Sequence, residues 1–231
     1  MPRPPRVYKT PAIVLRQRGL GEVDKIITLY TANYGKVDAV AKGVRRVKSR
    51  LAGSVEPLSH GEYLLARGRN LDIVTQVQPI ETFQPLRDDL ERLSRALYTA
   101  ELIDRATEER AENFALYRLL LDTLRRLAQR DDLDLALRFF ELALLDQLGY
   151  RPQLDECVVC RRPLAAEGNS WAPGAGGAVC RGRDCRPADT PLSHLSPGAL
   201  STLRLLQSGS FTETAREAMS TGVAGEIERH L

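Results

Sequence analysis

The sequence lacks the features that would mark a membrane or secreted protein. No stretch comes near the roughly 18 uncharged apolar residues that span a bilayer. The apolar run near the N-terminus is broken by Arg16 and Arg18, so no signal-peptide core is present. Cysteine is scarce, with 4 in 231 residues. We therefore expect a cytoplasmic protein whose cysteines are thiols or metal ligands rather than disulfides.

Signatures of catalysis and nucleotide binding are also missing. The 3 histidines are scattered and form no grouping with serine, cysteine or aspartate. Residues 43–49, GVRRVKS, lack the glycine directly before the lysine that a phosphate-binding loop needs. Glu22 and Asp24 could hold a divalent cation as nuclease carboxylates do, but carboxylates on a strand surface are the commoner case. An ATP-driven enzyme is therefore disfavoured.

Charge is distributed unevenly along the chain. The net charge is only +3, but residues 1–80 hold 14 lysines and arginines against 6 acidic residues. Residues 81–156 hold 11 against 17, and residues 157–231 hold 8 against 7. A basic head, an acidic middle and a near-neutral tail indicate a polyanion-binding part joined to a different one.

Residues 6–80 have the pattern of short strands separated by turns. Runs rich in β-branched and aromatic residues are bounded by glycines, which predicts strands at 8–16, 26–30, 36–41, 62–66 and 71–77. Five short strands in about 75 residues match the size of an OB-fold, although an SH3-like barrel fits nearly as well. We predict the OB-fold.

The periodicity becomes helical after Pro85. Leu86, Leu90, Leu93 and Leu97 recur at the spacing of an amphipathic helix. Further helices are predicted at 112–129, at 132–148 with Gly149 as the terminating residue, after the N-cap pair Ser196-Pro197, and around 223–231.

These patterns predict an α+β protein. Its N-terminal five-stranded OB-fold barrel is followed by an all-α helical bundle that carries a four-cysteine zinc-binding insertion. The predicted parts are an OB-fold nucleic-acid-binding domain (1–80), a helical bundle (81–150), a four-cysteine zinc-binding segment (151–195) and C-terminal helices that pack on the bundle (196–231).

The four cysteines give the strongest local signal. Cys157 and Cys160 form a C-x2-C pair, and Cys180 and Cys185 follow after nineteen residues as a C-x4-C pair. This spacing fits a tetrahedral Zn²⁺ site, although a pair of disulfides or inert thiols is the alternative. Five flanking arginines would offset the negative charge of a zinc tetrathiolate. Because four thiolates leave no position open for water, we predict one structural Zn²⁺ per chain and no catalytic metal.

Cations are concentrated in the predicted barrel. Residues 40–53, VAKGVRRVKSRLAG, hold five cations and no carboxylate. Few aromatic residues accompany them, so backbone charge should dominate over base stacking, and both single strands and duplex DNA should bind. The candidate DNA-binding residues are Lys36, Lys42, Arg45, Arg46, Lys48, Arg50, Arg67 and Arg69.

Several runs within the first 58 residues resemble a known family. They are PAIVLR (11–16), GEVDKIITLYT (21–31), YGK (34–36), AVAKGVRR (39–46), KSRLAG (48–53) and EPL (56–58). In this order and spacing they resemble the N-terminal domain of the RecO family of bacterial recombination mediators. The resemblance implies a non-enzymatic DNA repair protein that binds single- and double-stranded DNA and anneals complementary strands. It further implies cooperation with RecR (and RecF) in loading RecA onto strands coated by single-strand-binding protein, in the bacterial cytoplasm at the nucleoid.

Two other functions stay open at the level of sequence. The basic face could dock an acidic protein partner, which would make the chain an interaction scaffold. The zinc segment, or the pair Glu22 and Asp24, could instead mark a metal-dependent nuclease.

Overall fold

The computed structural model describes residues 6–46, 49, 51–129, 132–182, 184–188, 190–208, 211 and 221–231. It divides into two compact units, Met1–Asp131 and Asp132–Leu231. This boundary falls inside the helical bundle predicted at 81–150, whose third helix belongs to the second unit. The predicted division into four parts stays a prediction.

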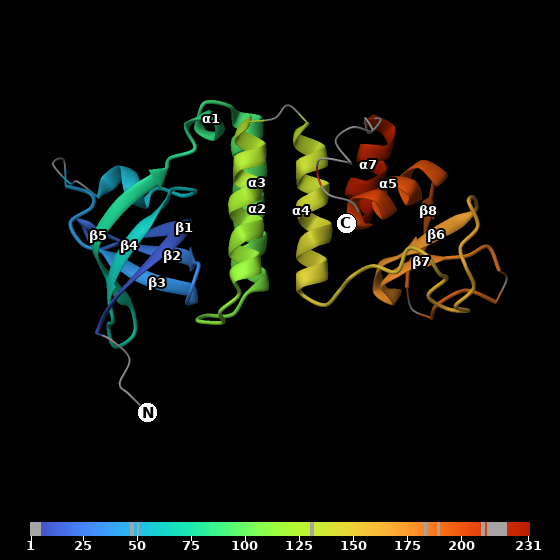
Figure 1. Ribbon diagram of the computed structural model, residues 1–231, viewed down its shortest axis with the longest axis horizontal. Helices are drawn as coiled ribbons and strands as arrows, with labels where there is room; N and C mark the ends of the chain where they lie inside the picture. The colour runs from blue at the N-terminus through green and yellow to red at the C-terminus, as the bar shows by residue number, and fades with distance from the viewer. Residues whose placement is uncertain are drawn as a thin grey trace. The chain divides into compact units, whose positions relative to one another are not determined.

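The first unit contains a closed five-stranded barrel. Its strands are β1 (Val7–Leu20), β2 (Asp24–Thr31), β3 (Gly35–Ala41), β4 (His60–Ala66) and β5 (Asp72–Glu81), in the order β1-β2-β3-β5-β4 (Figure 1). Neighbouring strands are antiparallel except β3 and β5, which pair in parallel at Ala39 and Asp72. A closed five-stranded barrel followed by helices confirms the predicted α+β class and the OB-fold.

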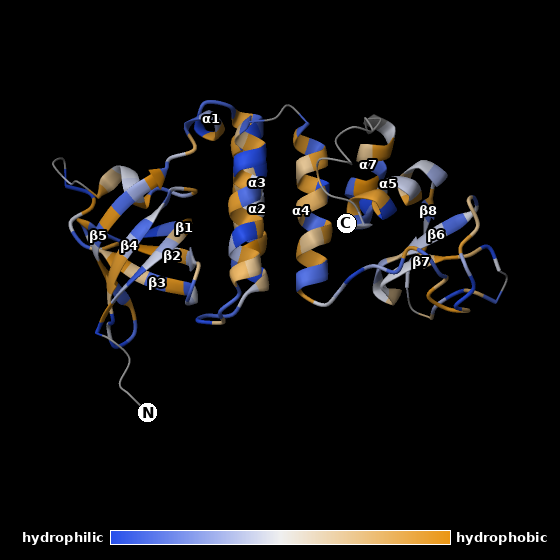
Figure 2. Cartoon of the chain, viewed as in Figure 1, coloured by the Kyte–Doolittle hydropathy of each residue, from blue (hydrophilic) through white to orange (hydrophobic). Residues whose placement is uncertain are grey.

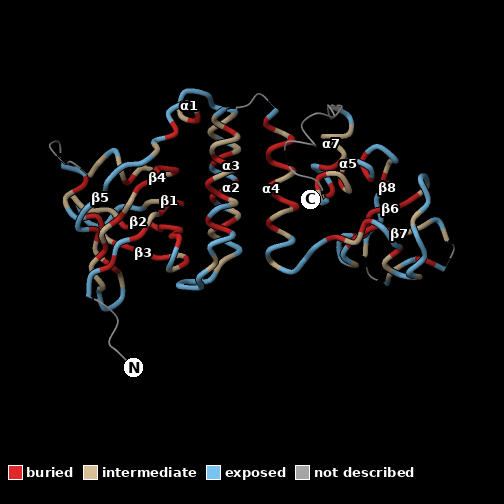
Figure 3. The backbone as a smooth tube through the Cα atoms, viewed as in Figure 1, coloured by how far each residue is buried: buried red, intermediate tan, exposed pale blue. Residues whose placement is uncertain are grey.

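Alternate residues of the strands fill the barrel core. Ala12 and Val14 of β1 face it together with Ile27 and Leu29 of β2, as the two-residue period of a strand requires. Val44, in the loop after β3, also packs in this core. Figure 3 shows buried residues along the strands and exposed residues in the loops.

Three helices follow the barrel in the first unit. They are α1 (Gln84–Arg87), α2 (Leu90–Ala106) and α3 (Phe114–Gln129). Helices α2 and α3 pack on each other, and hydrophilic and hydrophobic residues alternate along both (Figure 2). Such alternation is typical of helices that bury one face.

The apolar face predicted for the first helix is correct only in part. Leu86 is buried in α1 and Leu93 is half-buried, whereas Leu90 and Leu97 are exposed. The Asp89 carboxylate accepts hydrogen bonds from the N–H groups of Glu91 and Arg92, and this N-cap begins α2 as a helix separate from α1. Leu90 consequently lies in the first turn, where it is 82% exposed, and Leu97 is 40% exposed. The buried face of α2 is formed instead by Ala96, Thr99, Ala100 and Ile103.

The outer face of β1 and β2 is buried as well. Ile13 pairs with Tyr30 across the two strands, and both point away from the barrel core, yet both are 0% exposed. Helix α2 packs on β1, and its Asp104 forms ion pairs with Arg16 of β1 and Lys36 of β3. The helix therefore covers this side of the barrel, where each large apolar side chain that it buries contributes about 2 kcal/mol.

The second unit combines helices with a small sheet. The sheet has the order β7-β6-β8, and Trp171 of β6 donates its Nε1–H to the backbone oxygen of His230 at 3.0 Å. Helices α5 and α7 pack on α4. The elements of this unit are α4 (Leu133–Gln147), β6 (Asn169–Ala172), the short 3₁₀ helix η2 (Pro173–Ala175), β7 (Gly177–Val179), β8 (Ser193–Leu195), α5 (Pro197–Ser208) and α7 (Thr221–His230). A second 3₁₀ helix, η1 (Ala52–Val55), belongs to the first unit.

The predicted helix ends of the second unit are confirmed. The Ser196 hydroxyl accepts the N–H of Ala199 at 3.1 Å, which caps α5. Gly149 follows α4 with a φ of 82°, the left-handed conformation that favours glycine. None of the helices in the described ranges is long and apolar enough to cross a bilayer.

A buried histidine joins β4 to α3. His60 is 4% exposed, and its Nε2 lies 2.8 Å from the hydroxyl of Tyr117. Its Nδ1 lies 3.5 Å from the carboxylate of Glu81, which also binds Arg125. Burial lowers the pKa of His60 in spite of Glu81, so the folded protein holds a neutral imidazole at neutral pH.

This histidine should make stability depend on pH. Because the pKa of His60 is lower in the folded chain than the usual value of about 6.5, the unfolded chain takes up more protons as the pH falls below that value. We expect the free energy of unfolding to fall as the pH is lowered from about 7.5 to about 5.5, by up to about 1.4 kcal/mol per pH unit. This pH range lies above the one in which carboxylates titrate. Denaturant unfolding of wild type and His60→Gln measures this, and the variant should show a shallower dependence on pH.

The matched control is His194→Gln, which changes an exposed histidine in β8 and should leave the wild-type pH dependence in place. Equal pH dependence in wild type and His60→Gln would contradict the assignment.

Candidate nucleic-acid interface and metal centre

The loop between β3 and β4 presents a group of exposed cations. Lys42, Arg45 and Arg46 are exposed, and none of them pairs with a carboxylate of the described chain. We call these three residues the β3–β4 loop cluster. Lys48 and Arg50, also predicted to bind DNA, lie outside the described residues. The described part of the loop thus carries three positive charges that are free to meet an anion.

The backbone beneath this cluster is fixed by three contacts. The N–H of Arg45 donates to the backbone oxygen of Val23 at 3.0 Å, and the N–H of Gly43 donates to the Asp24 carboxylate at 2.6 Å. Val44, between them, is buried in the barrel core. Val44 thus anchors the described half of the loop, and Val47 lies outside the described residues. Gly43 has a φ of 63°, the left-handed conformation that favours glycine in a turn.

The loop between β4 and β5 holds two more of the predicted cations. Arg69 is exposed, and Arg67 is partly buried over the rings of Tyr8 and Tyr34. We call Arg67 and Arg69 the β4–β5 loop cluster. Neither arginine pairs with a carboxylate in the ranges that the structure describes.

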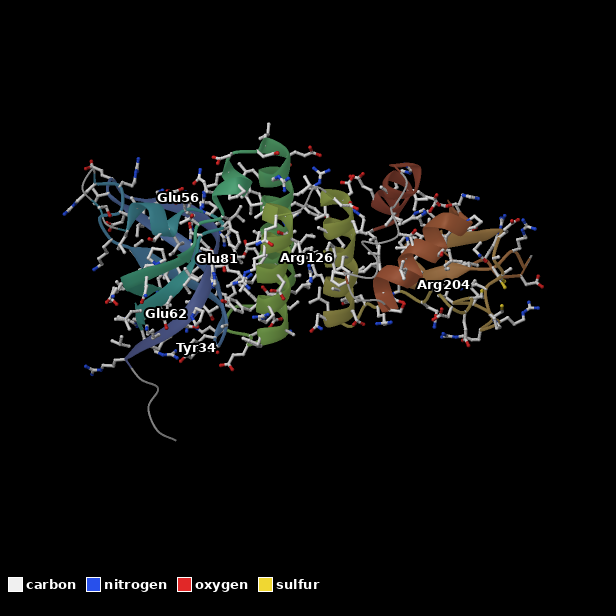
Figure 4. All side chains as sticks on the ribbon, turned by 45° about the horizontal axis from the view of Figure 1, so that its top comes forward. Tyr34, Glu56, Glu62, Glu81, Arg126 and Arg204 are labelled. Atoms are coloured by element: carbon white, nitrogen blue, oxygen red, sulfur yellow. The ribbon has the colours of Figure 1, made fainter. Side chains whose placement is uncertain are left out.

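The two clusters lie at opposite ends of β1. At one end Leu20 pairs with Asp24, next to the turn that binds Arg45, and at the other end Val7 pairs with Ala66, directly before Arg67. Figure 4 shows Glu56, from the β3–β4 connection, and Tyr34 at opposite ends of the barrel. The exposed cations among the candidate DNA-binding residues therefore form two separate sites.

Lys36 is held in a contact with α2 instead of facing solvent. Its side chain is 13% exposed, and its Nζ lies 3.2 Å from Asp104 Oδ1 and also donates to the backbone oxygen of Asp104. Arg16 binds the other oxygen of the same carboxylate at 2.6 Å. Lys36 is thus committed to the helix, so the structure argues against its predicted role in DNA contact. Its partner is 68 residues away, which is why the sequence did not reveal the pair.

The covered face of the barrel limits where a ligand can bind. OB-folds bind oligonucleotides on the outer face of strands 2 and 3 and in the flanking loops. In this chain Ile26, Thr28 and Tyr30 lie on that face of β2, and all three are buried. The strands of the described barrel also carry exposed cations, such as Lys9 and Arg18 of β1, but these are paired with carboxylates. The exposed cations of the described barrel without a carboxylate partner lie outside the strands.

A buried aspartate that sequence analysis missed organises the β4–β5 loop. Asp72 is 1% exposed and accepts hydrogen bonds from the Tyr8 hydroxyl, from the N–H of Gly68 at 3.2 Å and from Arg110 at 3.1 Å. Arg110 lies between α2 and α3, and its N–H donates to the backbone oxygen of Lys36 at 2.9 Å. In the sequence, the only sign of this role of Asp72 was the presence of an aspartate at the start of a predicted strand.

Gly35 allows the α2–α3 connection to approach the β2–β3 turn. Its φ is 62°, and a Cβ at this position would lie 2.1 Å from the backbone oxygen of Ala111. Only glycine fits both constraints. Gly35 therefore both forms the β2–β3 turn and admits a segment that is distant in sequence.

The carboxylate pair considered for a nuclease is partly occupied. Asp24 accepts the N–H of Gly43, while Glu22 is exposed. Across the described ranges, the one group of three or more side chains that could hold a metal consists of cysteines. The structure thus gives no support to a carboxylate metal site at Glu22 and Asp24.

The four cysteines predicted as metal ligands come together. The sulfur atoms of Cys157, Cys160, Cys180 and Cys185 all lie within 4.8 Å of one another, and all four residues are free thiols. The sulfurs of Cys160 and Cys180 are 3.8 Å apart. A tetrahedral ion with metal–sulfur bonds of about 2.3 Å requires sulfurs about 3.8 Å apart, so the cluster matches a four-thiolate metal site.

Two turns position these sulfurs. In the first, the N–H of Arg161 donates to the backbone oxygen of Cys157 at 2.9 Å, and Arg161 takes a φ of 60°. The N–H of Val158 donates to the backbone oxygen of Ala178 at 3.0 Å, which ties this turn to β7. The second pair begins at Cys180, directly after β7. The small sheet therefore holds both pairs of cysteines in register.

The surroundings of the sulfurs favour the thiolate at Cys160, whereas hydrogen bonding to Cys180 raises the pKa of the Cys185 thiol to about 12. Arg162 donates to the sulfur of Cys160 at 3.5 Å and lowers the pKa of that thiol to about 6. A Cβ on Gly182 would lie 3.0 Å from the sulfur of Cys185 and 3.4 Å from that of Cys180. The exposed Arg161 adds positive charge nearby. The site thus has the ligands, spacing and electrostatics of a metal centre with a closed coordination sphere.

Comparisons with known proteins cover both units of the chain. The family model "Recombination protein O N terminal" matches residues 6–83, and "Recombination protein O C terminal" matches residues 87–231. A "DNA repair protein RecO" from Roseiflexus sp. (strain RS-1) is 44% identical over 226 residues, which are 98% of this chain and 79% of the relative.

Two further relatives carry the same name. The protein from Symbiobacterium thermophilum is 39% identical over 228 residues, covering 97% of this chain and 89% of the relative. The protein from Dehalococcoides mccartyi (strain CBDB1) is 36% identical over 224 residues, covering 97% and 87%. Together with the barrel and the cysteine cluster, these matches show that the chain belongs to the RecO family of DNA repair proteins.

Proposed function

We propose that this protein is a recombination mediator that binds single- and double-stranded DNA and anneals complementary strands without catalytic turnover. The observation that carries the proposal is the β3–β4 loop cluster, whose three exposed cations have no carboxylate partner among the described residues. Lys48 and Arg50 would extend the same cationic loop. Contacts of this kind read the phosphate backbone and not the sequence.

The two clusters also suit the annealing reaction. Annealing requires that two strands be held by the same protein or assembly, and two cationic sites at opposite ends of one barrel provide two places for phosphate contacts. The name shared by the relatives places the family in DNA repair. On that basis we infer that RecR, RecF and single-strand-binding protein are partners in loading RecA, at the bacterial nucleoid in the cytoplasm.

An interaction scaffold is the second candidate, because exposed arginines that bind phosphates also bind acidic peptides. The two functions differ in their response to DNA. A mediator binds oligonucleotides with an affinity that falls steeply with salt, whereas a scaffold would bind an acidic partner and leave DNA unbound.

We also propose that the cysteine cluster holds one structural Zn²⁺ per chain. Zinc takes four thiolates in a closed tetrahedron, and such sites stabilise segments that have few apolar residues. The apolar residues packed around these cysteines are few, with Ala172 and Val179 the buried ones. Cys157, Cys160, Cys180 and Cys185 would bind the ion, and their own role is to tie the two turns to the sheet.

Removing cations from the β3–β4 loop should weaken DNA binding in a salt-dependent way. For Arg45→Gln/Arg46→Gln, the loss of two phosphate contacts should reduce the slope of log affinity against log salt by about 1.4 for single strands and about 1.8 for duplex. Fluorescence anisotropy of a labelled oligonucleotide across about 50 to 200 mM salt measures both slopes.

The matched control is Arg105→Gln/Arg118→Gln. It removes two arginines, one on α2 and one on α3, whose side chains are at least half exposed and pair with acidic residues on the same helix. It should leave the slopes unchanged. An unchanged slope in Arg45→Gln/Arg46→Gln would show that this loop is not a DNA site.

If the cysteines hold zinc, the metal should be found in the purified protein, and its loss should destabilise the second unit. The purified protein should contain about one zinc per chain, and less than about half an equivalent without prior chelation would contradict the proposal. Cys157→Ser should lower the unfolding temperature of the second unit, which the fluorescence of Trp171, the single tryptophan, reports. The DNA affinity of the folded fraction should change much less, because the proposed DNA contacts lie in the first unit.

A further inference from the structure

We infer that Arg67 is a base-stacking residue, and that the β4–β5 loop is the part of the barrel that distinguishes single-stranded from duplex DNA. This role rests on the proposed DNA binding, and it assigns unpaired nucleobases as the ligand of the β4–β5 loop cluster. A flat guanidinium can stack on an unpaired nucleobase, whereas bases inside a duplex are stacked on each other and do not present their faces.

Two tyrosines hold the Arg67 guanidinium in place. Its Cζ lies 4.9 Å from the centroid of the Tyr8 ring and 5.8 Å from that of Tyr34. The two rings meet edge to face with centroids 4.4 Å apart. These cation–π contacts fix the position of a side chain that would otherwise be flexible.

A hydrogen-bond network fixes the tyrosines and the loop in turn. Asp72 is buried, and its carboxylate binds the hydroxyl of Tyr8, the N–H of Gly68 and the guanidinium of Arg110. The N–H of Arg67 donates to the backbone oxygen of Arg6 at 2.8 Å. The loop is tight at Gly68, where a Cβ would lie 1.8 Å from the backbone oxygen of Leu71. The site is therefore ordered before any ligand arrives, which reduces the entropy cost of binding.

The side-chain nitrogens of Arg67 have no hydrogen-bond or ion-pair partner among the described residues. Its Nε is buried and has no hydrogen-bond partner within the described part of the chain, and no carboxylate there forms an ion pair with it. Gly68, Arg69 and Asn70 beside it are exposed. Tyr34, which is partly exposed, lies at the same end of the barrel (Figure 4). A preorganised cation with an open loop and aromatic neighbours has the components of a nucleobase stacking site.

The β3–β4 loop cluster has none of these features. In the described residues, Lys42, Arg45 and Arg46 make no contact with an aromatic ring. Phosphate contacts of that kind suit single strands and duplex alike. The two ends of the barrel are thus assigned different tasks, with general backbone binding at one end and recognition of unpaired bases at the other.

A charge-conserving substitution tests the assignment. Wild type, Arg67→Lys and the control Arg69→Lys are each titrated with an oligothymidylate, with an abasic deoxyribose-phosphate strand of equal length and with a duplex. Arg69→Lys alters the same loop at an exposed arginine outside the tyrosine pair. The ratio of two affinities measured on one protein preparation is independent of the folded fraction, so a loss of stability does not obscure the result.

We expect wild type to prefer the oligothymidylate over the abasic strand by about fivefold or more, the value of one stacked base. Arg67→Lys should lose most of two preferences, that for the oligothymidylate over the abasic strand and that for single-stranded over duplex DNA. Arg69→Lys should keep both preferences. Retention of the preference in Arg67→Lys, or an equal affinity of wild type for both strands, would overturn the inference while leaving the proposed DNA binding intact. If wild type binds none of the three ligands, the proposed function itself fails.

Discussion

The packing of α2 on the outer face of β1 and β2 decides which parts of the barrel can meet another molecule. Ile13 and Tyr30 are buried there, and the Asp104 carboxylate binds cations from two strands at once. On β2, the face that an OB-fold commonly offers to oligonucleotides is thus buried. The exposed cations of the barrel that have no carboxylate partner among the described residues lie instead outside its strands, mainly in the loops at the barrel ends.

The two loops and the cysteine segment are each ordered by a different means. The β3–β4 loop is anchored by Val44 in the core and by the carboxylate of Asp24, so its cations are displayed without being neutralised. The β4–β5 loop depends on the buried Asp72, which would be costly to leave unpaired and which here has three partners. The cysteine segment has few apolar residues, and four sulfurs within 4.8 Å take the place of a larger core.

Much of this architecture follows from local sequence patterns. The five strands, the caps at Ser196 and Gly149 and the clustering of four cysteines depend on neighbours in sequence or on a recognisable spacing, and the structure contains all of them. The differences have two causes. The predicted apolar face of the first helix failed at Leu90 and Leu97 because a local N-cap at Asp89 begins a new helix. The ion pair of Lys36 was not foreseen because its partner is 68 residues away. The stacking of Arg67 on Tyr8 likewise requires the folded barrel.

We propose that the loops at the barrel ends, and not the β2–β3 face, contact DNA. Hydrogen–deuterium exchange of the full chain, with and without a saturating oligothymidylate, distinguishes the two surfaces. We expect slower exchange in residues 42–46 and 67–70 when DNA is bound, with little change in residues 26–31 of β2 and 36–40 of β3. Protection centred on β2 and β3, with both loops unchanged, would show that DNA binds the strand face and would contradict the proposal.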